Sequence, residues 1–263
     1  MATVKEIFAC LDRLAPVETK MDFDNVGFLA GFGDTIVTRA VAALDITSEV
    51  IDEAAEADAQ LIVSHHPMFF SLKRVTDDDP TGARVARLLR AGLSAICMHT
   101  NLDAAEQGVN YALARAAGIR DAQLLTVEGT DSTGRDYSCA RWGHLERPMT
   151  MEEYLPFIKA ALNTRGLRYY DAGRPVSRIA TVGGSGGSYL QDACARGCDT
   201  LLTADVKYDV FLEAKELGMN LIDGDHFCTE NLVVPLLRDK LAEGFPGVEV
   251  LISRRHGQTA RFF

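Results

Sequence analysis

Hydrophobic positions recur with two periods along this chain, and together they predict an α/β protein. Val4, Ile7 and Leu11 are spaced as on one face of a helix, and residues 3–6 have the pattern of a capping box. By contrast, residues 61–63 form a short continuous apolar run, which is typical of a parallel strand buried on both faces. Stretches of both kinds alternate through most of the sequence.

Residues 124–127 and 137–145 predict a pair of strands with no helix between them, so we expect this pair to be antiparallel. Residues 150–153 repeat the capping-box pattern. The expected helices lie at 4–14, 48–55, 81–91, 108–117, 150–162, 190–194 and 208–217, with one long helix after 228. The other expected strands lie at 39–44, 61–64, 95–99, 178–182, 200–203, 220–222 and 248–252.

The order of these elements is similar in the two halves of the chain. In each half a helix is followed along the chain by an apolar run that ends in polar residues. A second helix, a glycine and a second strand come next, and a histidine follows that strand. We therefore expect two similar α/β lobes with mixed sheets flanked by helices. The expected lobes are residues 1–125 and 126–263, each offering the carboxyl ends of its strands to a shared cleft.

Composition and charge limit the classes of function. The chain has 263 residues, 47% of them hydrophobic, and a net charge of −10, which argues against non-specific DNA binding and against binding to an anionic membrane. No apolar run approaches the ~20 residues of a membrane span, and the first residues lack a signal-peptide pattern. Six scattered cysteines form no disulfide framework, so we expect a cytoplasmic protein.

Three apolar runs end in residues that commonly bind metals. The first ends in His65 and His66, the second leads to His99 and Asp103, and the third leads to a segment with His226 and Glu230. His226 and Glu230 are four residues apart, which places both on one side if their segment is helical. Each piece also has a structural explanation, because a polar strand end, a capping Asp or a core His would look the same.

Together these residues favour a metal site. The nitrogen and oxygen donors of His65, His66, Asp103, His226 and Glu230 suit Zn, Fe or Mn. Five protein ligands exceed what one open catalytic metal usually takes, so two divalent ions per chain are expected. Two such ions activate water for hydrolysis at neutral pH.

At these residues the chain resembles the Nif-three-like family, whose bacterial members are known as GTP cyclohydrolase I type 2 homologues. The resemblance spans nearly the whole chain. The length of the chain is similar to that of the short form of the family. It differs at Phe23, where the family usually has Trp, and after Tyr208, where members often carry His. The motifs that carry it are Phe23-Asp24-Asn25-Val26-Gly27, Ser64-His65-His66-Pro67, His99-Thr100-Asn101-Leu102-Asp103, Ala204-Asp205-Val206-Lys207-Tyr208, and Asp225-His226 with Thr229-Glu230.

The resemblance implies a Nif-three-like fold, a dinuclear metal site on the five residues above, and a ring-shaped homohexamer. Its label implies a metal-dependent hydrolase that opens the ring of GTP, for which His99 would shuttle a proton. The glycine-rich residues 183–188 then have two interpretations, a phosphate-binding loop or a close packing of backbone. Two alternatives to the cyclohydrolase stay open, a dinuclear phosphoesterase and a non-enzymatic protein that handles metals or regulates a partner.

Overall fold

The computed structural model describes residues 2–263, and the chain folds into two compact units. Unit 1 comprises Met1–Leu102 and Val233–Gly257, and unit 2 comprises Asp103–Leu232 and Gln258–Phe263. Met1, the first residue of the expected first lobe, lies outside the described residues. The protein is a mixed α/β protein, as the hydrophobic pattern predicts.

The bounds of these units differ from the expected lobes at 1–125 and 126–263. The main reason is strand β15 (Glu249–Ile252), which pairs in parallel with β4 (Arg39–Ala43) and so belongs to unit 1. Residues 103–125, expected in the first lobe, belong to unit 2, because α5 (Val109–Ala116) packs on strand β12 (Val176–Ser185). Neighbourhood in the sequence therefore does not decide which unit a segment joins.

Unit 1 is built around a five-stranded sheet with the order β15-β4-β5-β6-β2. Strands β15, β4, β5 (Leu61–Ser64) and β6 (Ser94–Cys97) are parallel, and β2 (Gly27–Ala30) closes the sheet antiparallel to β6. Every residue of β5 and β6 is buried, which explains their continuous apolar runs. A separate short pair joins β1 (Ala2–Thr3) to β3 (Ile36–Val37).

Helices cover the sheet of unit 1. The sequence predicts the N-terminal cap of some of these helices but not of all. The expected capping box of Thr3 and Glu6 begins α1. Helix α3 begins at Pro80, one residue before the expected start at 81, because Asp79 caps it and Pro80 occupies its first turn. The unit-1 helices are α1 (Val4–Leu14), η1 (Val17–Thr19), α2 (Ser48–Glu56), α3 (Pro80–Arg90) and α10 (Val233–Gly244).

Unit 2 contains a six-stranded mixed sheet with the order β11-β14-β13-β12-β10-β7. The three central strands, β12, β13 (Thr200–Ala204) and β14 (Asn220–Asp223), are parallel to one another. The outer strands are antiparallel to their neighbours, including the expected pair of β7 (Gln123–Leu124) and β10 (Arg141–Met149). The remaining strands are β11 (Arg168–Tyr170) and the short pair β8 (Gly129–Thr130) and β9 (Asp136–Tyr137).

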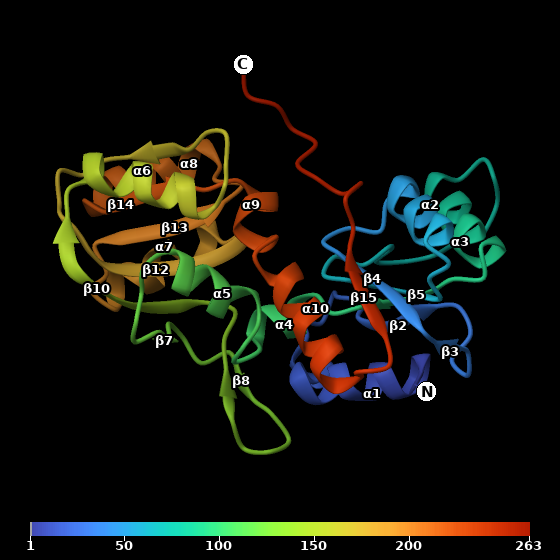
Figure 1. The fold of residues 1–263 in the computed structure, drawn as a ribbon. Coiled ribbons are helices and arrows are strands. Elements are labelled where there is room, and N and C mark those ends of the chain that lie inside the picture. The colour runs from blue at the N-terminus through green and yellow to red at the C-terminus, as the bar shows by residue number, and fades with distance from the viewer. Residues whose placement is uncertain (1) are drawn as a thin grey trace. The chain divides into compact units, whose positions relative to one another are not determined.

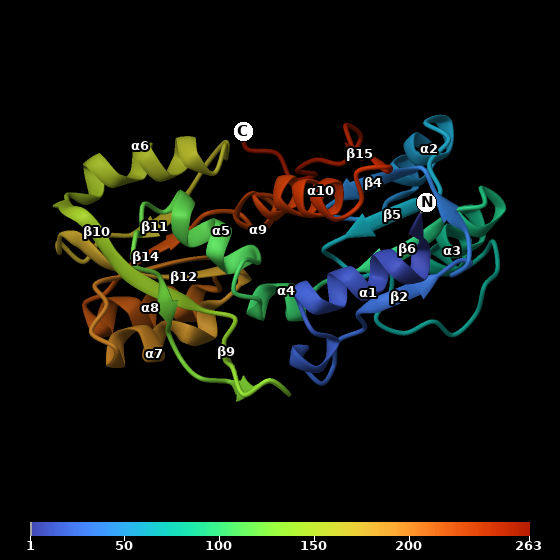
Figure 2. The same cartoon turned by 60° about the horizontal axis from the view of Figure 1, so that its bottom comes forward.

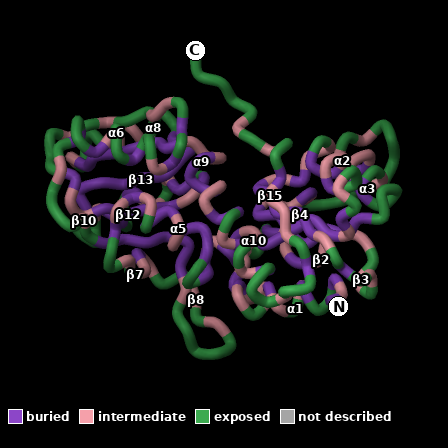
Figure 3. Tube along the Cα trace, viewed as in Figure 1, coloured by how far each residue is buried: buried purple, intermediate pink, exposed green. Residues whose placement is uncertain are grey.

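Both faces of the unit-2 sheet are covered by helices (Figures 1 and 2). Ile179, Leu202 and Ile222 point to the side of α5 and α6 (Met151–Ala161), and the alternate strand positions point to α7 (Leu190–Ala195) and α8 (Tyr208–Leu217). The buried stretches in Figure 3 follow the central strands. Two further short helical elements are η2 (Gly187–Tyr189) and α4 (Thr100–Ala104), and the chain passes from unit 1 to unit 2 within α4.

The expected long final helix is two helices. The first, α9 (His226–Glu230), belongs to unit 2, and α10 starts at Val233 in unit 1. The chain passes from unit 2 to unit 1 between Leu232 and Val233, and the helix is interrupted there. The apolar pattern continues across this interruption, so the sequence predicts a single helix. Among residues 2–263, no helix has both the length and the apolar character needed to cross a membrane.

Candidate metal centre

Two histidines of unit 1 follow directly after the buried strand β5. The His65 side chain is buried, and its Nδ1 lies 2.9 Å from the carbonyl oxygen of Met98. The His66 Nδ1 lies 2.7 Å from a carboxylate oxygen of Asp45, which follows the neighbouring strand β4. Both acceptors lack a proton, so Nδ1 donates in each case, and the neutral imidazole has its lone pair on Nε2.

A third histidine, His99, follows β6 and is held by Asp24. Its Nδ1 donates to the Asp24 carboxylate at 2.8 Å, and the second oxygen of that carboxylate accepts from the Thr100 backbone at 3.0 Å. Burial raises the pKa of Asp24, but the hydrogen bonds from His99 and Thr100 outweigh it and hold that pKa well below its usual range. Asp24 is therefore a charged acceptor that orients the His99 ring.

These three histidines lie close enough together to bind one metal ion. One nitrogen from each of His65, His66 and His99 lies within 4.8 Å of the other two. The ring centroid of His99 lies 5.2 Å from that of His65 and 5.5 Å from that of His66. Unit 1 thus brings together the two expected ligands His65 and His66 and the expected proton shuttle His99.

Unit 2 holds the other expected residues, around helix α9. The His226 Nδ1 lies 2.7 Å from the Asp205 carboxylate, and its Nε2 lies 3.0 Å from the Glu230 carboxylate. Burial lowers the pKa of His226, but the hydrogen bonds and charges of Glu230 and Asp205 outweigh it and raise that pKa to about 9. His226 is consequently an imidazolium at neutral pH, and a metal ion bound at Nε2 would replace one proton.

Asp103 lies in the same unit, with a carboxylate oxygen within 4.8 Å of one of Glu230. Its segment is anchored by a buried arginine, because Arg141 donates to the carbonyl oxygens of Ala104 and Ala105 at 3.1 Å. Asn110 also donates to the Asp103 carbonyl at 3.2 Å. The unit-2 group therefore consists of one imidazole and two carboxylates.

Gly184 makes room for the buried carboxylate of Glu230, which is 4% exposed. A Cβ at Gly184 would collide with the Glu230 carboxylate, and the residue adopts a φ of +61°, which side chains disfavour. Position 184 therefore requires glycine for two independent reasons.

The same segment resolves the two interpretations of residues 183–188. Strand β12 continues through Ser185, and the helix α7 that follows has six residues. The backbone N–H groups of Gly183, Gly184 and Gly186 donate to side chains of Asn110, Thr229 and Thr203 at 2.7, 3.1 and 2.8 Å. These donors are already used, so the structure favours close packing of backbone over a phosphate-binding loop.

The aspartates that hold His66 and His226 occupy equivalent places in the two units. Each follows one parallel strand, and its histidine follows the neighbouring strand 21 residues later. The two segments align without gaps at a constant offset of 160 residues (205 against 45, 226 against 66). The identical pairs are Asp45/Asp205, Val50/Val210, Glu53/Glu213, Ala54/Ala214, Glu56/Glu216, Leu61/Leu221, Ile62/Ile222 and His66/His226.

Sequence reasoning missed the roles of Asp24, Asp45 and Asp205. Asp24 and Asp205 enter the sequence analysis only as parts of the family motifs, and the strand expected at 39–44 ends just before Asp45. The constant offset is the signal that could have identified Asp45 and Asp205, because both members of each Asp–His pair recur in it. Asp24 has no counterpart in that alignment, and its contact to His99 spans 75 residues.

Known proteins resemble the chain over nearly its whole length. A Clostridium perfringens protein named GTP cyclohydrolase 1 type 2 homolog is 32% identical over 254 residues, which cover 95% of this chain and 96% of that protein. A Staphylococcus aureus hypothetical protein of known structure is 27% identical, with a TM-score of 0.92 and 99% of each chain covered. A Bacillus cereus protein related to NIF3 has the same TM-score at 21% identity, with 100% of this chain and 99% of that chain covered, which shows a shared fold.

The family model described as Duf34/NIF3 (NGG1p interacting factor 3) matches residues 2–258. That match includes every residue of the two groups described above. It agrees with the resemblance that the motifs around His65, His99 and His226 indicate. This chain belongs to the Duf34/NIF3 family.

Proposed function

We propose that the protein binds two divalent metal ions per chain and is a metal-dependent hydrolase of a nucleotide. The proposed ligands are His65, His66, Asp103, His226 and Glu230. One observation carries the proposal: ring nitrogens of His65, His66 and His99 lie within 4.8 Å of one another, and each of these rings donates Nδ1 to a carbonyl or carboxylate oxygen. Metal-binding histidines are commonly held in this way, because the second contact orients the ring and makes the ligating nitrogen more basic.

The chemistry of the donors fits divalent metals. Imidazole nitrogens and carboxylate oxygens suit Zn, Fe or Mn, whereas none of the six cysteines belongs to either group. Such ions, when bound, act as Lewis acids and lower the pKa of water towards neutrality. The nearly buried carboxylate of Glu230 supplies negative charge that favours a cation at this place.

His99 has the proposed role of a proton shuttle. Asp24 holds Nδ1, so Nε2 is the atom at which His99 would accept and release a proton. Its nitrogen lies among those of His65 and His66, and a third metal ligand is the competing role for this residue. His99→Gln separates the two roles, since a shuttle variant keeps its metal and loses turnover, whereas a ligand variant loses metal.

Metal content tests the ligands directly. Untagged protein measured by plasma mass spectrometry is expected to hold two metal ions per chain, and His66→Ala and Glu230→Ala are expected to hold fewer. The matched control is His144→Ala, because His144 also donates Nδ1 to an aspartate, Asp121, at 3.0 Å but lies outside both groups. If both ligand variants kept two ions per chain, the ligand assignment would be wrong.

Turnover by the metal-replete protein tests the reaction. Ring opening of GTP removes the guanine absorbance without releasing inorganic phosphate, and this result supports a cyclohydrolase. Release of phosphate would instead favour a phosphoesterase. Two bound metals with neither reaction, and with rapid metal exchange, would favour a protein that handles metals or regulates a partner.

A further inference from the structure

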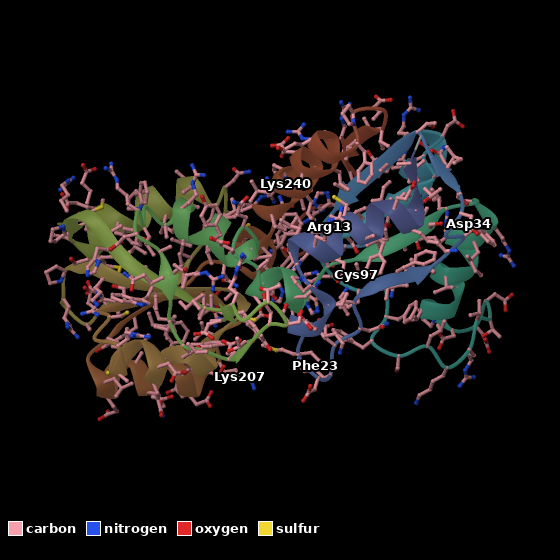
Figure 4. All side chains as sticks on the ribbon, turned by 90° about the horizontal axis from the view of Figure 1, so that it is seen from below. Arg13, Phe23, Asp34, Cys97, Lys207 and Lys240 are labelled. Carbon is pink, nitrogen blue, oxygen red and sulfur yellow. The ribbon has the colours of Figure 1, made fainter. Side chains whose placement is uncertain are left out.

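Two exposed phenylalanines lie beside the histidine group of unit 1. Phe23 is 66% exposed and Phe70 is 56% exposed, and their ring centroids lie 6.2 Å apart. Phe70 also contacts His99 edge to face, with centroids 5.9 Å apart. A continuous row of aromatic rings therefore leads from the surface, where Figure 4 labels Phe23, to His99 and the other two histidines.

The loops that carry these phenylalanines are fastened together. Asn25 donates its side-chain amide to the Phe69 carbonyl at 2.8 Å, which joins the loop of Phe23 to the loop of Phe70. The neighbour of Phe23, Asp24, is held by His99 and Thr100, and the Met21 backbone donates to the Thr100 hydroxyl at 3.0 Å. Polar contacts thus hold the backbone that carries the two exposed rings close to His99.

We infer that Phe23 and Phe70 form a stacking platform for the planar nitrogen heteroaromatic ring of the substrate, such as a purine. Exposed aromatic faces bind bases by stacking, which tolerates different ring substituents. The platform ends at His99, so a ring stacked on it would present its edge to the residue proposed to move protons. This inference rests on the proposed function. It narrows the proposed substrate from any nucleotide to a nucleotide that the protein recognises by its base.

The comparison of two probes tests the platform. Guanosine 5′-monophosphate has the ring and ribose 5-phosphate lacks it, so calorimetric titration of both isolates binding by the ring. We expect the nucleotide to bind at least ~10-fold more tightly than the sugar phosphate. Each of Phe23→Leu and Phe70→Leu should weaken nucleotide binding ~10-fold, leave sugar-phosphate binding unchanged and retain the metal content of the wild type.

Two further variants serve as controls. Phe32→Leu removes another phenylalanine of unit 1, 58% exposed, and is expected to bind the nucleotide as the wild type does. Phe23→Trp keeps an aromatic face, so it should retain affinity, and its fluorescence should be quenched by the nucleotide. The natural Trp142 is 7% exposed in unit 2 and contributes a steady background.

Two results would overturn the platform: equal binding of the two probes, or unchanged nucleotide binding in both leucine variants. Titrations of metal-loaded and metal-stripped protein separate this outcome from failure of the proposed function. A protein with two metals and no preference for the nucleotide would retain the metal site and lose the platform. A protein that prefers the nucleotide but holds no metal would retain the platform and lose the proposed metal chemistry.

Discussion

Units 1 and 2 hold one histidine in the same way but surround it with different chemistry. The Asp45–His66 and Asp205–His226 contacts are both 2.7 Å, and each joins the ends of two neighbouring parallel strands. Equivalent positions one residue before and four residues after these histidines differ. His65 corresponds to Asp225, which caps α9 by accepting from the Cys228 backbone at 3.1 Å, and Phe70 corresponds to Glu230.

The common frame of the two units is the pair of neighbouring parallel strand ends that carries Asp45 and His66 in unit 1 and Asp205 and His226 in unit 2. The difference shows that this frame can present two kinds of ligand. Unit 1 has three imidazoles and an exposed aromatic pair, whereas unit 2 has one imidazole and two buried or partly buried carboxylates. The Asp–His pair depends on strand ends, which both units share. The other candidate ligands depend on single side chains near the strand ends, and these side chains differ between the two units.

The largest expected effect concerns the glycine that accommodates Glu230. Gly184→Ala should lower the free energy of unfolding by about 2–4 kcal/mol, because the new Cβ meets the Glu230 carboxylate and φ is positive. Chemical denaturation measures this change. The control is Gly218→Ala, where φ is +62° but the space is open, and which should cost only about 1 kcal/mol. Equal losses in the two variants would contradict the role given to Glu230.

The next effect concerns the aspartates of the common frame. Asp45→Asn and Asp205→Asn should each reduce metal affinity about 10–100-fold, because a neutral amide makes the bound imidazole a weaker ligand. Competition against a chromophoric chelator measures the affinities. Asp121→Asn removes the corresponding charge from the surface histidine His144 and should leave metal affinity unchanged. Wild-type affinity in both frame variants would show that these pairs only support the fold.

A smaller effect is expected at Glu53, whose equivalent in unit 2 is Glu213. Burial raises the pKa of Glu53, but hydrogen bonds from the Ser253 hydroxyl and the Arg254 and Arg255 backbone outweigh it and lower that pKa. A carboxylate with a lowered pKa stabilises the fold above its unfolded pKa, and this contribution is lost as the pH falls through the folded pKa.

Glu53→Gln should therefore lower the free energy of unfolding by about 1 kcal/mol at pH 7 and flatten its decline in acid at pH values below the ordinary pKa of a glutamate. Urea denaturation at pH 7 and in acid measures both changes. Glu213→Gln is the control, because the Glu213 carboxylate accepts a surface hydrogen bond from the Gln191 side chain at 2.6 Å. An unchanged pH dependence in Glu53→Gln would refute this contribution.

The smallest effect compares the turns that end α2 and α8. Asp58 and Gly218 are equivalent and have φ of 52° and 62°, a region that favours glycine. Asp58→Gly should raise the free energy of unfolding by a few tenths of a kcal/mol, because relief of backbone strain is partly offset by the freer unfolded chain. Gly218→Asp should lower it by a similar amount. Thermal unfolding measures both, and changes of the same sign would contradict the equivalence of the turns.

Much of the local structure was predictable from the sequence. Both capping boxes, at Thr3 and Thr150, begin helices as expected, because such caps depend only on residues within one turn. The buried parallel strands were predictable for a similar reason, since burial on both faces demands a continuous apolar run. The cap of α3 was missed because Asp79 belongs to a run of three aspartates that indicates solvated surface.

The sequence by itself determined the α/β class, the family and the histidines at the strand ends. Each of these depends on short contiguous stretches, namely local hydrophobic periodicity and local motifs. Only the tertiary structure decided which unit β15 joins, that Asp24 holds His99, and that Gly184 makes room for Glu230. These contacts join residues far apart in the chain. Their partners are selected by the pairing of strands and the closeness of packed backbone, neither of which leaves a local pattern in the sequence.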